Sequence, residues 1–80
     1  MRLVLYCTDS EESVLTRDID FKVTLEMIRV AGFCIGVETN KAGDVLFPDI
    51  WVEDGEETQG EILLACLESF LRTLKEKLDG

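Results

Sequence analysis

The sequence predicts an α+β fold, a two-layer domain in which a mostly antiparallel sheet of about four strands is packed by one long C-terminal amphipathic helix. Three observations support this prediction. An apolar run opens the chain at residues 3–7, polar and apolar residues alternate over 18–27, and leucines recur with a helical period over 63–78. We expect residues 1–80 to form a single small acidic domain.

The first segments predict one strand and its connection. Leu3 to Cys7 are bounded by polar residues and predict a buried strand, which could pair with either neighbour. The next stretch, DSEESVLTR, predicts a loop or one short helical turn, because Thr8 and Glu11 have the spacing of a capping box.

The alternation from Asp18 to Met27 predicts a second strand, because a helix would scatter its apolar residues around the circumference. A β-bulge is expected where the alternation breaks at Met27-Ile28. Ala31-Gly32 predicts a hairpin turn, and FCIGVET a returning strand with Phe33, Ile35 and Val37 on one face.

The sequence NKAGD predicts a further turn, and VLFPDIWVE the last strand. Pro48 cannot donate to a ladder, so this strand is expected at an edge, at least on that side. The helix is expected from Thr58 onward, with Thr58 and Glu61 as a capping box. Its apolar stripe is too short for a sustained coiled coil and should pack on the sheet; it consists of Leu63, Leu67, Phe70, Leu71, Leu74 and Leu78.

Composition narrows the function classes. With no histidine and three widely spaced cysteines, Cys7, Cys34 and Cys66, we expect no zinc site, no disulfide framework and reduced thiols packed as small hydrophobes. We expect no cofactor and no dedicated metal site, because DGEETQGE lacks calcium-loop spacing. The chain has no recognisable nucleophile–base pair or phosphate loop, so an enzyme is not expected. No membrane span or signal-peptide core is evident, which indicates a cytoplasmic protein.

The net charge of −9 is concentrated in one segment. The thirty residues between Lys41 and Arg72 contain eight acids and no cation, whereas the rest of the chain is almost balanced. Such a field repels nucleic acid and anionic membranes, and it attracts basic protein surfaces. Charge of this kind also keeps small proteins soluble, and a solvated loop is the simplest explanation for the acids from Glu53 to Glu57.

Trp51 lies inside this segment, and strict alternation would place it on one face with Phe47, Asp49 and Glu53. If the helix covers the opposite face, Trp51 is exposed within an acidic rim and resembles a binding hot spot. The reverse assignment buries Trp51, and both faces are nearly apolar enough for burial. Carboxylates at positions 49 and 53 would lie about 13 Å apart on a strand, so an acid array could occupy a groove meant for phosphates.

One local resemblance accompanies this pattern. Phe47-Pro48-Asp49-Ile50 resembles the Phe-Pro-Asp-Leu motif of HicB-type antitoxins, and Gly55, Glu56 and Thr58 resemble their Gly-Asp-Thr step with an insertion. The Pro-Gly-Cys that follows the first motif in that family is missing, and the likeness covers under half of the chain. The resemblance implies an antitoxin that covers a ribonuclease toxin.

The leading hypothesis is a non-enzymatic acidic inhibitor or adaptor that masks a basic, nucleic-acid-handling protein, as antitoxins, immunity proteins and phage anti-defence or anti-CRISPR proteins do. Its partner-binding residues are predicted to be Asp49, Trp51, Glu53, Asp54, Glu56 and Glu57. A homodimer is compatible with this design. The alternative is a self-associating assembly subunit that uses the Pro48 edge or the leucine stripe. A third hypothesis, an enzyme with a carboxylate pair, would need a deep pocket.

Overall fold

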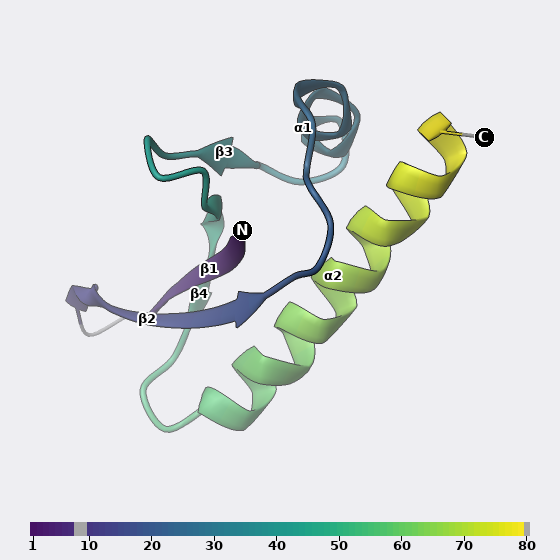
Figure 1. The fold of residues 1–80 in the computed structure, drawn as a ribbon. Helices are drawn as coiled ribbons and strands as arrows, with labels where there is room; N and C mark the ends of the chain where they lie inside the picture. Colours follow the sequence, from purple (N-terminus) through teal and green to yellow (C-terminus); the bar gives the residue numbers. More distant parts are fainter. Residues whose placement is uncertain (8–9, 80) are drawn as a thin grey trace.

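A four-stranded sheet and a long C-terminal helix form the two layers of the protein (Figure 1). The computed structural model describes residues 1–7 and 10–79, without the side chains of 10–13. The elements of this part are β1 (Arg2–Cys7), β2 (Ser10–Asp18), α1 (Leu25–Gly32), β3 (Glu38–Thr39), β4 (Val45–Val52) and α2 (Glu57–Asp79). The predicted α+β fold class is confirmed.

The strand order is β2-β1-β4-β3, so β1 is central. It pairs antiparallel with β2 and parallel with β4, and β3 pairs antiparallel with β4. The N-terminal strand is therefore confirmed and pairs on both sides. The prediction of a loop or helical turn before Asp18 is wrong, because β2 occupies residues 10–18. Of the capping pair proposed there, Thr8 lies outside the described residues.

The second predicted strand is wrong, because α1 begins at Leu25. The alternation does hold in the burial of the irregular segment 19–24, where Ile19, Phe21 and Val23 point inward. A cap then starts the helix: the Thr24 hydroxyl accepts a hydrogen bond from the Met27 N–H at 3.2 Å. Burial of Met27 and Ala31, four residues apart, gives α1 its inner face.

Two further predictions fail with that strand. Met27-Ile28 lies inside α1, where no bulge exists, and Ala31-Gly32 ends the helix instead of forming a hairpin turn. The returning strand is reduced to Glu38–Thr39, and Phe33 is 85% exposed while Ile35 and Val37 pack against the core. The predicted turn over 40–44 is confirmed, with Gly43 at φ 87° and its N–H donating to the Asn40 carbonyl at 3.0 Å.

The pairing of β4 explains how Pro48 is tolerated and which side chains of the strand are buried. β4 lies between β1 and β3, so the edge position is wrong in strand order, but Pro48 belongs to neither pairing register. The register with β1 shifts between Val4↔Leu46 and Tyr6↔Trp51. This irregularity reverses the facing of the strand, and Phe47 is fully buried while Trp51 is 44% exposed. Strict alternation, which placed both on one face, was therefore wrong.

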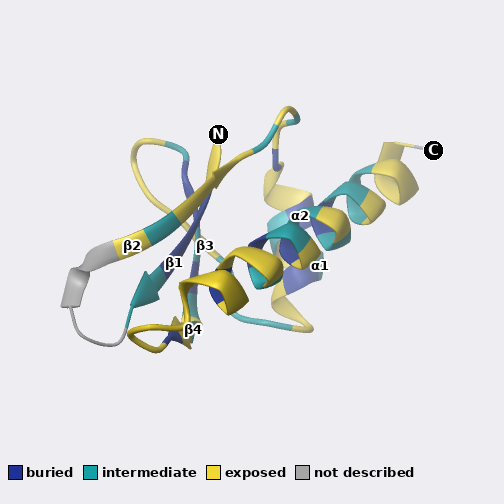
Figure 2. Ribbon diagram, turned by 90° about the horizontal axis from the view of Figure 1, so that it is seen from below, coloured by how far each residue is buried: buried dark blue, intermediate teal, exposed yellow. Residues whose placement is uncertain are grey.

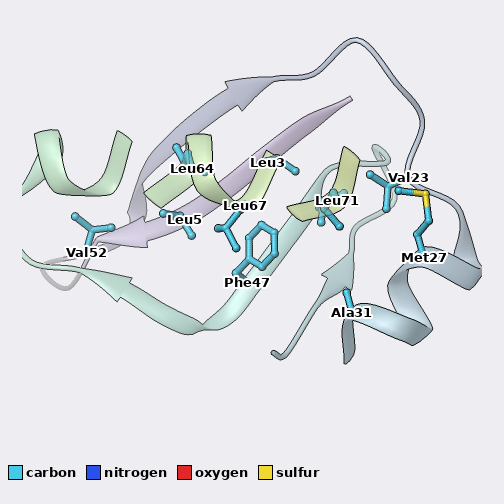
Figure 3. Close-up of a cluster of buried hydrophobic side chains, with 11 residues drawn as sticks. Leu3, Leu5, Val23, Met27, Ala31, Phe47, Val52, Leu64, Leu67 and Leu71 are labelled. Atoms are coloured by element: carbon cyan, nitrogen blue, oxygen red, sulfur yellow. The ribbon is translucent and has the colours of Figure 1, made fainter. Parts of the chain in front are cut away.

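Helix α2 covers one face of the sheet, and the predicted stripe packs there from Leu63 to Leu74. Leu64, which lies outside the predicted stripe, is buried together with Leu67 and Leu71 (Figure 3). The core that it forms with the sheet and α1 includes Leu3, Leu5, Val23, Met27, Phe47, Leu64, Leu67 and Leu71. Burying a side chain of this size contributes about 1.5–3 kcal/mol. The end of the stripe differs, because Leu78 is 41% exposed.

The start of α2 differs by one residue from the prediction. The helix begins at Glu57, and the Glu56 carbonyl accepts the first helical hydrogen bond, from the Gly60 N–H at 3.0 Å. Thr58 thus lies inside the first turn, and the predicted capping box with Glu61 is wrong. Neither helix combines the length and apolar character needed to cross a membrane, as far as the described residues show.

The three cysteines are free, but they do not all pack as small hydrophobes. Cys7 is half-buried, whereas Cys34 and Cys66 are exposed, so that interpretation is wrong for the latter two. Cys34 lies just after α1, and Cys66 lies on the outer side of α2.

Candidate partner-binding site at the acidic end

The site lies where β4 ends and α2 begins, and Gly60 makes this arrangement possible. Gly60 is buried, and a Cβ there would overlap the Leu15 side chain and approach a Val52 methyl to 3.0 Å. The first turn of α2 can therefore lie directly against the end of β4. A tight connection joins them, in which Gly55 has φ 86° and the Glu56 N–H donates to the Glu53 carbonyl at 3.0 Å.

This close approach forms a small notch open to solvent, which we call the Trp51 notch, with a volume of about 220 Å³. Its lining comes from the end of β4, the connection and the first two turns of α2. The lining residues are Trp51, Val52, Glu53, Glu56, Gln59, Gly60 and Leu63. Three of the six predicted site residues, Trp51, Glu53 and Glu56, therefore meet in one place.

The Trp51 side chain is held in a defined orientation. Its indole N–H donates to the Pro48 carbonyl at 3.1 Å, and its ring lies against Tyr6 with the centroids 5.4 Å apart. Tyr6 comes from the neighbouring strand β1, at the position paired with Trp51. The indole is thus fixed by the sheet and by the irregular segment around Pro48, while 44% of the residue stays exposed.

The other predicted residues lie around the notch or away from it. Asp54 and Glu57 are exposed on the connection and at the first position of α2, next to the notch. Asp49 is also exposed, but it is not part of the lining. Its carboxylate faces Gly36, where an added Cβ would overlap it. Figure 2 shows the loop after β4 and the start of α2 as mostly exposed.

The eight acids between Lys41 and Arg72 fall into two groups, those that form ion pairs and those that do not. Asp44 pairs with Arg2 at 3.1 Å, and Glu68 pairs with Arg17 at 2.7 Å and Arg72 at 3.4 Å. The hydrogen bonds from Arg2 and Arg17 lower the pKa of Asp44 and of Glu68 below their usual values. Within the described part of the chain, the other six acids have no ion-pair partner: Asp49, Glu53, Asp54, Glu56, Glu57 and Glu61.

A larger groove of about 670 Å³ lies toward the other end of α2. Its lining includes Met1, Leu25 and Leu78 together with Lys22, Lys41 and Lys75. This groove was not predicted, because its lining residues come from segments far apart in the sequence that share no local pattern. A helix of 23 residues rises about 1.5 Å per residue, so roughly 33 Å separates the ends of α2. The groove and the Trp51 notch are therefore distinct surfaces.

No group of three His, Cys, Asp or Glu side chains that could hold a metal ion occurs among the residues the structure describes. Of the acids predicted for the site, only Glu53 and Glu56 line the notch. What the arrangement offers chemically is an exposed aromatic residue, Trp51, beside buried apolar residues and two exposed carboxylates, Glu53 and Glu56.

Comparison of the chain with protein-family models, with curated proteins and with solved structures finds no match in any of the three. The Phe47-Pro48-Asp49-Ile50 resemblance to HicB-type antitoxins thus stays a local likeness of sequence.

Proposed function

We propose that this protein is a non-enzymatic acidic inhibitor or adaptor, which binds a basic, nucleic-acid-handling protein in the cytoplasm and covers its nucleic-acid-binding surface. One observation carries the proposal: exposed Trp51 lines a notch with two carboxylates, Glu53 and Glu56, for which the described residues supply no cation. Antitoxins, immunity proteins and anti-defence proteins are the functional types that this design suits.

The proposed mechanism has two parts. The carboxylates at the acidic end, which we define as Glu53, Asp54, Glu56, Glu57 and Glu61, attract and orient a basic surface during diffusion. Trp51 then supplies binding energy when the contact excludes water, because large aromatic residues dominate the energetics of interfaces. The partner's phosphate-binding residues would face carboxylates in place of phosphates, so the protein would act as a nucleic-acid mimic.

The test begins with capture of a basic protein from the lysate of the source cell, followed by measurements on the purified pair. Glu53→Gln with Glu56→Gln should weaken binding about tenfold, since exposed charge pairs contribute up to about 1 kcal/mol each. The same variant should flatten the dependence of Kd on salt concentration. The captured protein should lose nucleic-acid binding when the wild-type protein is added.

A matched control removes two acids elsewhere. Glu38→Gln with Glu76→Gln changes the net charge equally, but both residues are exposed at positions outside the notch. This control should leave Kd nearly unchanged. If the two variants weaken binding equally, or if neither does, the electrostatic mechanism is wrong.

The alternative proposal is a self-associating assembly subunit, and its favouring observation lies on and just after α1. Leu25 and Phe33, at 83% and 85% exposure, are the most exposed large apolar residues in the described part of the chain. The leucine stripe, in contrast, is largely used in the core. Light scattering of the purified protein separates the two proposals: a discrete oligomer that depends on Leu25 and Phe33, with no basic partner recovered, would favour the assembly subunit.

A further inference from the structure

We infer that the Trp51 notch is a subsite for one arginine side chain of the basic partner. This inference rests on the proposed function and adds to it the residue type that the notch selects. It follows from the lining of the notch, from the way Trp51 is held, and from a second site in the same protein that already binds a guanidinium group.

The notch combines an apolar interior with an acidic rim. Val52 and Gly60 are buried, Leu63 is half-buried, and these residues line the notch together with Trp51. Exposed Glu53 and Glu56 belong to the same lining. A side chain that fits has an aliphatic stem for the interior and a cationic head for the rim, which describes arginine and lysine.

The presence of an aromatic ring in the lining distinguishes between these two cations. A guanidinium group is planar, weakly hydrated and able to stack on an aromatic ring while it donates two parallel hydrogen bonds to a carboxylate. An ammonium group is strongly hydrated and acts as a point charge, so it gains less from the ring. The notch should therefore prefer arginine.

Trp51 is prepared for this role before a partner arrives. Its N–H is already satisfied by the Pro48 carbonyl, and Tyr6 supports the ring from β1. Binding would then need little reorientation of the indole, which lowers the entropic cost of the contact. The two rings are tilted by 32° to each other, and 44% of Trp51 stays exposed beside Tyr6.

The protein contains a comparable site that is occupied by one of its own arginine side chains. The Arg72 guanidinium lies 4.8 Å from the centre of the Phe21 ring and donates to Asp20 at 2.8 Å. An aromatic face beside a carboxylate thus already holds an arginine in this fold. The Trp51 notch has the same two components, and no cation belongs to its lining.

The test uses Trp51 as its own reporter, because it is the only tryptophan in the chain. Wild-type protein is titrated with blocked pentapeptides, Gly-Gly-Xaa-Gly-Gly, in which the central residue is arginine, lysine or citrulline. Arginine should change the Trp51 emission in a saturable manner, with a Kd at least threefold below that for lysine. Citrulline, which keeps the shape without the charge, should give no saturable change.

Two controls isolate the notch. Glu53→Gln with Glu56→Gln should weaken arginine-peptide binding at least threefold, whereas Glu38→Gln with Glu76→Gln should leave it unchanged. N-acetyltryptophanamide, titrated in parallel, corrects for collisional quenching. Equal response to arginine and lysine, a saturable response to citrulline, or insensitivity to the Glu53 and Glu56 changes would overturn the inference.

The outcomes keep this inference apart from the proposed function. If the peptides fail while the basic partner still binds through Glu53 and Glu56, the arginine subsite is wrong and the inhibitor proposal stands. If arginine binds in the notch but the acidic-end variants do not affect any partner, the subsite stands and the inhibitor proposal is wrong.

Discussion

At the scale of single residues, the carboxylate of Asp44 links distant parts of the chain through hydrogen bonds and an ion pair. It is the one buried charged side chain among the described residues, with 8% exposure. Its carboxylate accepts hydrogen bonds from Arg2 at 3.1 Å and from the Asn40 side chain at 3.3 Å. The Asp44 N–H also donates to the Asn40 side-chain oxygen at 3.0 Å, so this residue ties β1 to the turn before β4.

This network predicts a pH dependence. The hydrogen bond from Arg2 lowers the pKa of Asp44 below its ordinary value of 3.8. A lowered folded-state pKa means that ionised Asp44 stabilises the fold above about pH 4, and that this stabilisation is lost as the pH falls through the folded-state pKa. We expect the free energy of unfolding to fall below pH 4 in the wild type and to fall less in Asp44→Asn.

Urea unfolding followed by circular dichroism at pH 7, 5, 4 and 3 measures this effect. Asp44→Asn should also be less stable than the wild type at pH 7, because the pair with Arg2 is lost. Asp54→Asn is the control, since Asp54 is exposed and has no ion-pair partner among the described residues. A pH profile of Asp44→Asn identical to that of the wild type would contradict the assignment.

At the scale of elements, the contact between α2 and β4 determines whether the Trp51 notch exists. Gly60 normally would be a weakness in a helix, costing about 1 kcal/mol relative to alanine. Here it allows the first turn of α2 to touch Leu15 and Val52 from two different strands. Gly60 therefore lowers the helical propensity of this turn, but it allows the close packing that positions Glu56, Gln59 and Leu63.

We predict that Gly60→Ala destabilises the protein by up to about 2 kcal/mol, because the overpacking cost of about 1–3 kcal/mol exceeds the roughly 1 kcal/mol of helix propensity that alanine regains. The matched control is Gly32→Ala at the end of α1, where an added Cβ meets nothing within 4 Å. The control should be neutral or stabilising by up to about 1 kcal/mol. Urea unfolding reports both, and Trp51 emission should shift only in Gly60→Ala. A stabilised Gly60→Ala would show that α2 does not need this close approach.

At the scale of the whole molecule, charge is distributed along a body of 40 × 24 × 23 Å. The acidic end contributes five carboxylates without a cation, while Lys22, Lys41 and Lys75 lie along the groove toward the other end. At an ionic strength of 0.01 M the Debye length is about 30 Å, comparable with these dimensions, whereas at 0.15 M it is about 8 Å. Repulsion within the folded protein should therefore depend strongly on salt.

We predict that raising the salt concentration from about 0.01 to 0.15 M increases the free energy of unfolding, because screening relieves repulsion in a protein of net charge −9. Neutralising Glu53, Glu56 and Glu57 as glutamines should raise stability at low salt and reduce the salt response. Thermal and urea unfolding at both salt concentrations measure it. A wild type that loses stability as salt is added would show that its attractive ion pairs outweigh the repulsion.

Local patterns in the sequence determined the elements whose signal is strong and self-contained. The apolar run of β1, the turn around Gly43, the strand through Trp51 and the amphipathic period of α2 were all predicted. The concentration of acids between Lys41 and Arg72 was also found from the sequence, because charged residues can be counted without a structure. The prediction for the α1 region failed, because the alternation in the sequence continues to Met27 whereas the burial follows it only to Val23. Thr24 then caps a helix whose inner face is fixed by the burial of Met27 and Ala31 against other elements.

Only the tertiary structure decided which way Trp51 points and what surrounds it. Its exposure results from a register shift against β1, and that shift depends on pairing between residues more than forty positions apart. The Trp51 notch depends likewise on Gly60 touching Leu15 and Val52. The period of apolar residues indicates only which secondary structure a segment prefers locally. Long-range contacts that fill the core determine which way a strand faces after an irregularity and how closely a helix approaches the sheet.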